Sequence, residues 1–220
     1  MNRILYVFVL AFFVMAASCN KEADNSGTSP TAPGNFQPIK ANSTWDYEIA
    51  NLVTGINSVF QLKATSKDTT ANGRTYRVFT NSVGPNEYFN VTNEFHYQFG
   101  RFDALNTVLD LLYLRSDLAV NGTWDETKTI NISGTPLNVK FTYTIAEKGI
   151  VYTVGSKLYQ KVTRVHVVLS APGVPIASQD INFYYAENIG RIYSKVVLVV
   201  PLAGVNSSTE TRLTAYSIAP

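Results

Sequence analysis

Apolar and polar side chains alternate along much of the chain. Over residues 45–49, Trp, Tyr and Ile alternate with Asp and Glu, and the same period of two recurs over 60–64, 139–145 and 165–169. This period, with one apolar face, indicates antiparallel strands that are buried on one side. Residues 207–218 carry enough β-forming side chains to predict a final strand.

Turn residues separate these stretches. Asn72-Gly73 and Asn121-Gly122 lie between alternating segments, and Asn-Gly is a strong hairpin signal. Residues 196–202 are almost continuously apolar and predict a strand buried on both faces. The fold class expected is therefore all-β, an antiparallel sandwich or incomplete barrel, with one β domain over residues 36–220.

One segment fits two structures. Residues 102–120 contain aspartates at 103, 110 and 117, which would share one face of an amphipathic helix. The alternative is a short helical turn followed by a strand at 108–114, and this is the interpretation favoured here. Even on a helix, three such aspartates are more typical of a solvated surface than of a metal site.

A repeated motif suggests that the domain has two related halves. Asn42-Ser43-Thr44-Trp45-Asp46 returns as Asn121-Gly122-Thr123-Trp124-Asp125, and the two tryptophans are the only ones in the chain. Self-similarity at a long period indicates a duplicated unit. The repeats are expected at about 36–105 and 106–200, with each tryptophan in the core at the start of its half.

The N-terminus has the pattern of a secretory signal peptide over residues 1–18. Arg3 is followed by fourteen uncharged residues, from Ile4 to Ala17. As a helix, this segment would span roughly 21 Å, short of the roughly 30 Å hydrocarbon core of a bilayer. A permanent membrane-spanning helix is therefore the weaker interpretation.

The end of that segment resembles the lipobox of bacterial lipoproteins. Its residues are Ala16-Ala17-Ser18-Cys19, with Ala where Leu is commonest, and Cys19 is the only cysteine in the chain. The resemblance implies that Cys19 is the lipid attachment site and that the mature chain is held in a membrane by acyl chains such as palmitate. The alternative is an ordinary secreted protein with a chance cysteine.

Residues 19–35 predict a flexible tether. They are rich in Ser, Thr, Gly, Pro and Asn, and their charged patch, Lys21-Glu22-Ala23-Asp24, is similar to surface-export signals of Bacteroidetes lipoproteins. Tethers also carry charges without any such role. The localisation expected is the outer membrane, with the periplasmic face and the cell surface both left open.

Two further segments resemble small lipoproteins of Bacteroidetes. That group carries a G-x-x-W-x-Y opening and a late Y-Y-A-x-x-I-G-x-I segment, which correspond here to residues 42–47 and 184–192. The resemblance brings no activity with it.

The charge balance disfavours nucleic acid as a partner. Without Arg3 the mature chain keeps 17 of its 18 Lys and Arg residues, against 16 Asp and Glu, and it has no basic run.

Catalytic and metal motifs are not evident in the sequence, which contains no G-x-S-x-G, no H-E-x-x-H and no glycine-rich phosphate loop. We therefore predict no cofactor, no metal and no catalytic residue. His96 and His166 are predicted to lie on the polar face of their strands, with Phe95, Tyr97 and Phe99 turned to the core. Four acidic residues could in principle serve a glycan-active hydrolase that uses two carboxylates, although their strands would turn them to solvent: Asp46, Glu48, Asp125 and Glu126.

The aromatic residues are the remaining candidates for ligand contact. The chain has 13 Tyr and 12 Phe, and such rings serve as core residues or as platforms for sugars and lipids. Tyr184 and Tyr193 alternate out of phase with Phe183, Tyr185 and Ile192, which makes them the best candidates for exposed contacts to a glycan or lipid.

The sequence thus favours a lipid-anchored, non-enzymatic binding or structural module of the outer envelope. The first alternative is a lipid or lipoprotein carrier with an apolar concavity in a half-barrel, and the second is the carboxylate-dependent hydrolase. An apolar cavity of several hundred Å³ would favour the carrier, whereas a core packed shut would exclude it.

Overall fold

The computed structural model describes residues 34–132 and 135–220. The signal peptide, Cys19 and most of the tether therefore lie outside the described residues. Within the described part, no helix is long and apolar enough to cross a membrane.

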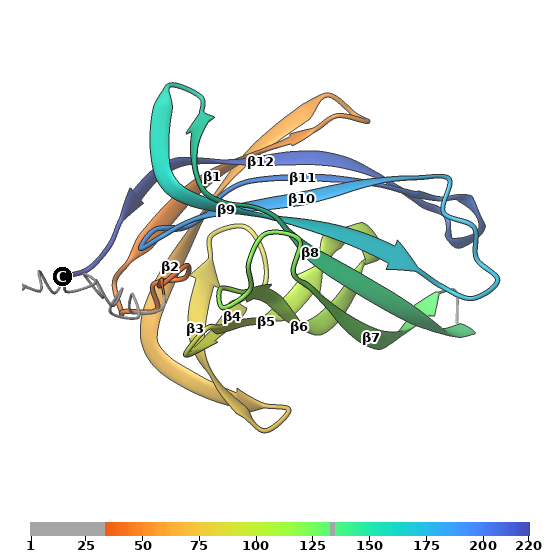
Figure 1. The fold of residues 1–220 in the computed structure, drawn as a ribbon, viewed down its shortest axis with the longest axis horizontal. Coiled ribbons are helices and arrows are strands. Elements are labelled where there is room, and N and C mark those ends of the chain that lie inside the picture. Colours follow the sequence, from red (N-terminus) through yellow and green to blue (C-terminus); the bar gives the residue numbers. More distant parts are fainter. Residues whose placement is uncertain (1–33, 133–134) are drawn as a thin grey trace, which may run out of the picture. The chain divides into compact units, whose positions relative to one another are not determined.

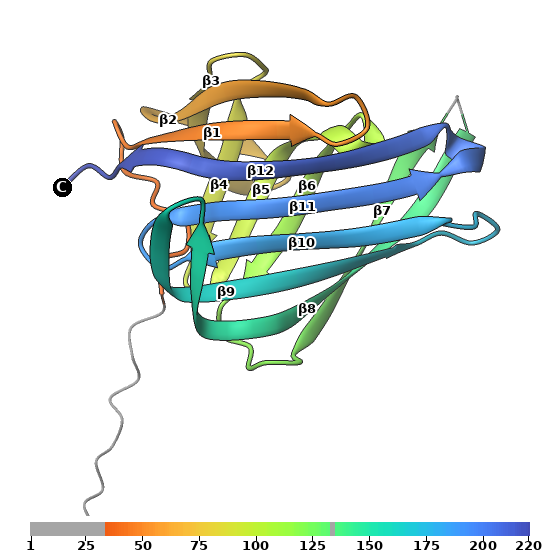
Figure 2. The ribbon, with the colours of Figure 1, turned by 90° about the horizontal axis from the view of Figure 1, so that it is seen from above.

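The described chain is built from strands joined by short connections (Figures 1 and 2). Two short 3-10 helices interrupt it, η1 (Asp103–Leu105) and η2 (Pro201–Ala203). The strands are β1 (Thr44–Asn51), β2 (Ile56–Ala71), β3 (Arg74–Asn81), β4 (Glu87–Thr92), β5 (Phe95–Phe102), β6 (Thr107–Arg115), β7 (Thr123–Ile132), β8 (Thr135–Val154), β9 (Lys157–Ser170), β10 (Ser178–Ala186), β11 (Gly190–Val200) and β12 (Val205–Ser217).

All twelve strands belong to one antiparallel sheet in the order β6-β5-β4-β3-β2-β1-β12-β11-β10-β9-β8-β7. The sheet curls until its edge strands, β6 and β7, face each other, so the fold is an incomplete barrel (Figure 1). The all-β prediction is confirmed. The favoured interpretation of residues 102–120 is also confirmed, because a helical turn, η1, precedes the strand β6.

The sheet divides into two meanders, β1–β6 and β7–β12, that meet at the β1–β12 ladder. Each tryptophan is the second residue of the first strand of its meander. The preceding asparagines, Asn42 and Asn121, both adopt positive φ, near 70°. Each donates its backbone N–H to a neighbouring strand at 2.8 Å, Asn42 to the Ala64 carbonyl and Asn121 to that of Ile145. The motif therefore forms the same local structure twice, and duplication of the halves stays a prediction.

The boundary between the two meanders is the connection 116–122, whereas the predicted repeats, which stay a prediction, divide at 105/106. Asn121-Gly122 belongs to this connection and joins two strands that do not pair with each other, so it is not a hairpin turn. Asn72-Gly73 is one, and both residues have the positive φ that a tight hairpin turn requires.

Side chains close the seam between β6 and β7. The indole Nε1 of Trp124 donates to the carbonyl of Leu112 at 2.8 Å, and the N–H of Leu112 donates to Oε2 of Glu126 at 2.9 Å (we call this pair of bonds the seam clasp). Trp124 also stacks on Tyr143 at 4.9 Å. Glu126 therefore lies on the same side of β7 as Trp124, and the prediction that it faces solvent is wrong.

Two long hairpins, β2–β3 and β8–β9, fold back on the outer face of the sheet. In the first, the buried Tyr76 donates its hydroxyl to Asp110 of β6 at 2.7 Å. In the second, Tyr152 stacks on Tyr184 of β10 at 4.2 Å. Parts of the outer face are therefore buried as well as the interior.

Because both faces of the sheet are partly buried, the side chains of β5 face the opposite way from the prediction. His96 is fully buried, with 0% of its surface exposed. Tyr97 lies on the outer side, where the guanidinium of Arg74 from the β2–β3 hairpin covers its ring at 3.8 Å. The prediction that His96 is a surface residue is therefore wrong, because aromatic side chains could be buried on the outer face too.

One end of the barrel is closed by the segment that precedes β1. Phe36 is buried there and donates its backbone N–H to Nε2 of His96 at 3.3 Å. The Nδ1 of His96 lies 3.3 Å from the Glu94 carbonyl, so this nitrogen carries the proton and the ring is neutral. Burial lowers the pKa of His96 to about 4.

The predicted strand over 196–202 ends early. β11 stops at Val200 and Pro201 begins η2, because proline cannot donate to a sheet ladder. Leu202 is 73% exposed, so the prediction of burial on both faces fails at this end.

Candidate functional site: the interior cavity

The barrel encloses a cavity of about 600 Å³. It lies at the end of the barrel opposite Phe36 and His96, where β1, β3 and β5 end and β4 and β12 begin. It reaches the surface beside the β3–β4 connection, at Val83, Gly84 and Pro85, all of which are exposed. The volume falls in the range of small-molecule sites, about 300–1,000 Å³.

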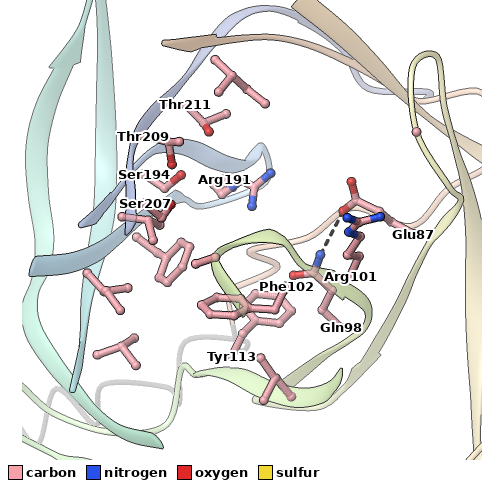
Figure 3. A pocket seen from close by; sticks show the side chains of 18 of the residues that line it. Glu87, Gln98, Arg101, Phe102, Tyr113, Arg191, Ser194, Ser207, Thr209 and Thr211 are labelled. Carbon is pink, nitrogen blue, oxygen red and sulfur yellow. Dashed lines mark hydrogen bonds between the residues drawn. The ribbon is translucent and has the colours of Figure 1, made fainter. Parts of the chain in front are cut away.

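The cavity has an apolar wall and a hydroxyl-rich wall. The apolar wall comes from β5, β6, β8, β9 and β10 and includes Phe102, Leu111, Phe141, Val167, Ile181 and Phe183. Four hydroxyl side chains of β11 and β12 form the facing wall: Ser194, Ser207, Thr209 and Thr211 (Figure 3). Such a lining suits a molecule that is apolar on one side and polar on the other.

Arg191 reaches into the space between these walls (Figure 3). Its Nε is shielded from solvent and has no hydrogen-bond partner in the described chain. Burial lowers the pKa of Arg191, but the Tyr47 phenol and Glu87 more than offset this, so the guanidinium stays charged. A shielded guanidinium nitrogen without a hydrogen-bond partner is costly, which makes Arg191 the least expected residue of the interior.

Two tyrosine hydroxyls of the cavity lining are also unpaired. The Oη atoms of Tyr113 and Tyr143 are buried and have no hydrogen-bond partner within the described residues. Burial raises the pKa of both phenols well above the ordinary value, so both keep their protons. They are free to donate hydrogen bonds to a molecule in the cavity, because both line it.

At the mouth, Glu87 is held by neighbouring amides. Gln98 donates to its Oε2 at 2.9 Å (Figure 3), and Asn81 donates to its Oε1 at 3.3 Å. Among the described residues that line the cavity, Glu87 is the one carboxylate. The two facing carboxylates that a glycosidase requires are not supplied by this lining.

The other acidic candidates lie elsewhere. Asp46 accepts a hydrogen bond from Gln61 and Glu48 accepts one from Asn57, both at exposed positions on the outer side. Asp125 is exposed and pairs with Lys140 at 2.9 Å, and Glu126 belongs to the seam clasp. The structure does not bring these four carboxylates together.

Tyr184 and Tyr193 lie outside the cavity, on the outer face as their phase predicted. The two rings contact each other at 5.4 Å, and Tyr152 of the β8–β9 hairpin packs on both. Burial raises the pKa of Tyr193 above its ordinary value. Their contact with a ligand stays a prediction, and it would have to be made around Tyr152.

The second histidine, His166, is part of a polar group on β9. Its Nδ1 lies 3.3 Å from Oδ1 of Asn182, which also accepts a hydrogen bond from Arg164. In the described part of the chain, no three His, Cys, Asp or Glu side chains are grouped to hold a metal ion.

Arg191 was not a candidate from the sequence. Strict alternation with Tyr193 would turn it outward, but the β10–β11 ladder has a bulge here, which pairs Tyr184 with Tyr193 and Tyr185 with Arg191. A bulge inserts one residue and re-aims the side chains beyond it. The preceding residue, Gly190, at φ 110°, is the sequence signal that could have indicated an irregular backbone.

Fold and site together define an incomplete twelve-stranded barrel with a partly polar interior cavity. No protein-family model and no curated protein matches the chain. Two solved structures are similar. One is described as a candidate lipoprotein from Parabacteroides distasonis, with 11% identity and a TM-score of 0.48 over 85% of this chain and 100% of that one.

The other is a candidate exported protein with a YmcC-like fold from Bacteroides fragilis, with 8% identity and a TM-score of 0.44 over 84% of this chain and 99% of that one. At these identities and TM-scores, neither similarity indicates a ligand or an activity for this chain.

Proposed function

We propose that this protein is a lipid-anchored binding protein of the outer envelope that holds a small amphipathic molecule inside its barrel. The observation that carries the proposal is the interior cavity of about 600 Å³ with its two unlike walls. A purely structural module gains stability from a filled core, since interiors normally pack to crystal-like density. An open space of this size inside the barrel favours the carrier over the structural module.

The polar lining supports the same conclusion. Unpaired buried polar groups are rare in folded proteins, and in this chain Arg191, Tyr113 and Tyr143 all contribute one at the cavity. A ligand that supplies the missing partners would stabilise the folded protein. The polar lining does not support the second alternative from the sequence, a hydrolase that uses two carboxylates.

Filling the cavity tests the proposal. Thr209→Phe places a ring inside the barrel, and Ser208→Phe places the same ring on the adjacent position of β12, which is not part of the cavity lining. Purified protein is titrated with an environment-sensitive fluorescent fatty-acid analogue. We expect saturable binding by the wild type and by Ser208→Phe, and loss of binding by Thr209→Phe with its fold intact by circular dichroism. Equal binding by all three proteins would refute the proposal.

The anchor is proposed from Cys19 and is tested separately. Cys19→Ser should release the protein from the membrane fraction of its host, and intact mass spectrometry of the wild type should show the mass of the attached acyl chains. A Cys19→Ser protein that still sediments with membranes would exclude the anchor. Protease treatment of whole cells then separates the periplasmic face from the cell surface, because only the surface-exposed protein is cleaved.

A further inference from the structure

We infer that Arg191 is the receptor for an anionic head group, and that the molecule held in the barrel is an acyl chain ending in a carboxylate. This inference rests on the proposed binding function and adds to it the chemical class of the ligand and the residue that recognises it.

The first argument is the Nε of Arg191, which has no hydrogen-bond partner in the described chain. Guanidinium groups inside proteins are normally paired with carboxylates, often through two parallel hydrogen bonds. Here the nearest aromatic contact is the ring of Tyr47, 5.3 Å from Cζ, and Nε is left without a partner in the described chain. The backbone carbonyl of Arg191 is used, since it accepts the hydroxyl of Tyr47 at 2.9 Å. The main chain is thus fixed while the charged end of the side chain is available.

The second argument is the surroundings of the guanidinium. The cavity lining contains one carboxylate, Glu87, already bonded to Gln98 and Asn81. The phenols of Tyr113 and Tyr143 line the same cavity, keep their protons and have no acceptor among the described residues. The Arg191 guanidinium and unpaired hydroxyl donors in one cavity suit a group with two acceptor oxygens, such as a carboxylate.

The third argument concerns the rest of the ligand. The wall that continues from Tyr113 is made of phenylalanine and branched aliphatic side chains, and each buried CH₂ on such a wall contributes roughly 0.8 kcal/mol. Phe36 and His96 close the end of the barrel opposite the mouth of the cavity. An unbranched chain with a terminal acid can occupy the apolar wall and place its head at Arg191. A sugar would leave this wall uncovered.

The test uses two probes that differ only at the head group. They are 11-(dansylamino)undecanoic acid and its methyl ester, and binding is followed by dansyl fluorescence. The proteins are the wild type, Arg191→Met, Arg191→Lys, and the control Arg212→Met. Arg212 is on the neighbouring strand β12, exposed and paired with Glu210, so its substitution removes the same charge from outside the cavity.

For the wild type and Arg212→Met, we expect the acid to bind at least tenfold more tightly than the ester. Arg191→Met should weaken binding of the acid roughly 10- to 100-fold, since hydrogen bonds to charged groups are the stronger ones, and should leave the ester unchanged. Arg191→Lys should retain part of the preference. The unfolding midpoint of ligand-free Arg191→Met should equal or exceed that of the wild type, because an unpaired buried charge is removed.

Each contrary result has a distinct meaning. If the wild type binds the ester as tightly as the acid, or if Arg191→Met binds the acid like the wild type, Arg191 is not the head-group receptor, while the binding function stands. If neither probe binds to the wild type, both the binding function and this inference fail. A strongly destabilised Arg191→Met would show that the guanidinium is part of the structural core and would also overturn the inference.

Discussion

The seam clasp gives a quantitative prediction about how the barrel is held shut. Glu126→Ala removes the acceptor of the Leu112 N–H, a hydrogen bond to a charged group at 2.9 Å. Bonds of this kind contribute about 1.5–3 kcal/mol, and the ion pair of Glu126 with Lys128 at 3.3 Å is partly exposed and adds little. We therefore expect a loss of about 2 kcal/mol in the free energy of unfolding, or a fall of about 4–8 °C in Tm for a chain of this size. Glu126→Gln keeps an acceptor and should cost about half as much.

The matched partner is Trp124→Phe, which leaves the Leu112 carbonyl without its donor, and the control is Trp45→Phe. Trp45 donates to the Ile189 carbonyl at 2.6 Å, so Trp45→Phe loses an equivalent hydrogen bond at a position away from the seam. Denaturant unfolding measures the cost, and hydrogen exchange of a peptide covering residues 107–115 locates it. Exchange there should quicken in the two seam variants and not in Trp45→Phe. Unchanged exchange and stability in Glu126→Ala would refute the idea that side chains close the barrel.

Three further predictions follow from buried groups. The pKa of His96 is about 4 in the folded protein, against about 6.5 in the unfolded chain. Between these two pH values only the unfolded chain takes up the proton. The free energy of unfolding should therefore fall as the pH drops from 6.5 to 4, by at most about 1.4 kcal/mol per pH unit. His96→Gln should reduce this dependence of stability on pH, as measured by urea unfolding at several pH values. The same dependence in His96→Gln as in the wild type would contradict the prediction. Tyr76→Phe removes the hydroxyl bonded to Asp110 at 2.7 Å and should cost about 1–2 kcal/mol, whereas the exposed Tyr216→Phe should cost nothing measurable by thermal unfolding. Gly190→Ala places a Cβ at φ 110°, 3.4 Å from Gln37, and should lower stability by about 1–3 kcal/mol; a Tm equal to that of the wild type would show that the backbone relaxes there.

Much of the fold could be predicted because one-sided burial leaves a clear period of two. Where both faces are covered, that signal fails. In β5, Tyr97 and Phe99 on the outer side are covered by the β2–β3 hairpin. Strict alternation therefore predicts the interior for Phe95, Tyr97 and Phe99 and the surface for His96, which is buried. A hairpin that folds back on its own sheet is a tertiary event with no local pattern.

The site was less predictable than the fold. A cavity is the space that many distant side chains leave empty, and no short motif encodes it. Arg191 enters it because of a bulge in the β10–β11 ladder, and a single inserted residue is invisible to strict alternation. Glu126 was missed for a related reason, since an unpaired backbone group on β6 determines its orientation. The sequence does not decide between a sandwich and an incomplete barrel, so it does not predict a seam between the edge strands of a barrel.

The pairing of β1 with β12 would allow the order of the strands along the chain to be changed by circular permutation. The domain begins and ends on neighbouring strands, and Ala219 donates its N–H to Oγ of Ser43 at 3.1 Å, so a short linker could join the two ends. Cutting the connection 116–122 in the same molecule would produce a circular permutant in which order along the chain equals order across the sheet. Every strand would then pair only with its neighbours in sequence, which lowers the contact order and should speed folding. In that permutant, no covalent link would remain between β6 and β7, and these two edges would be joined by the hydrogen bonds of Trp124 and Glu126.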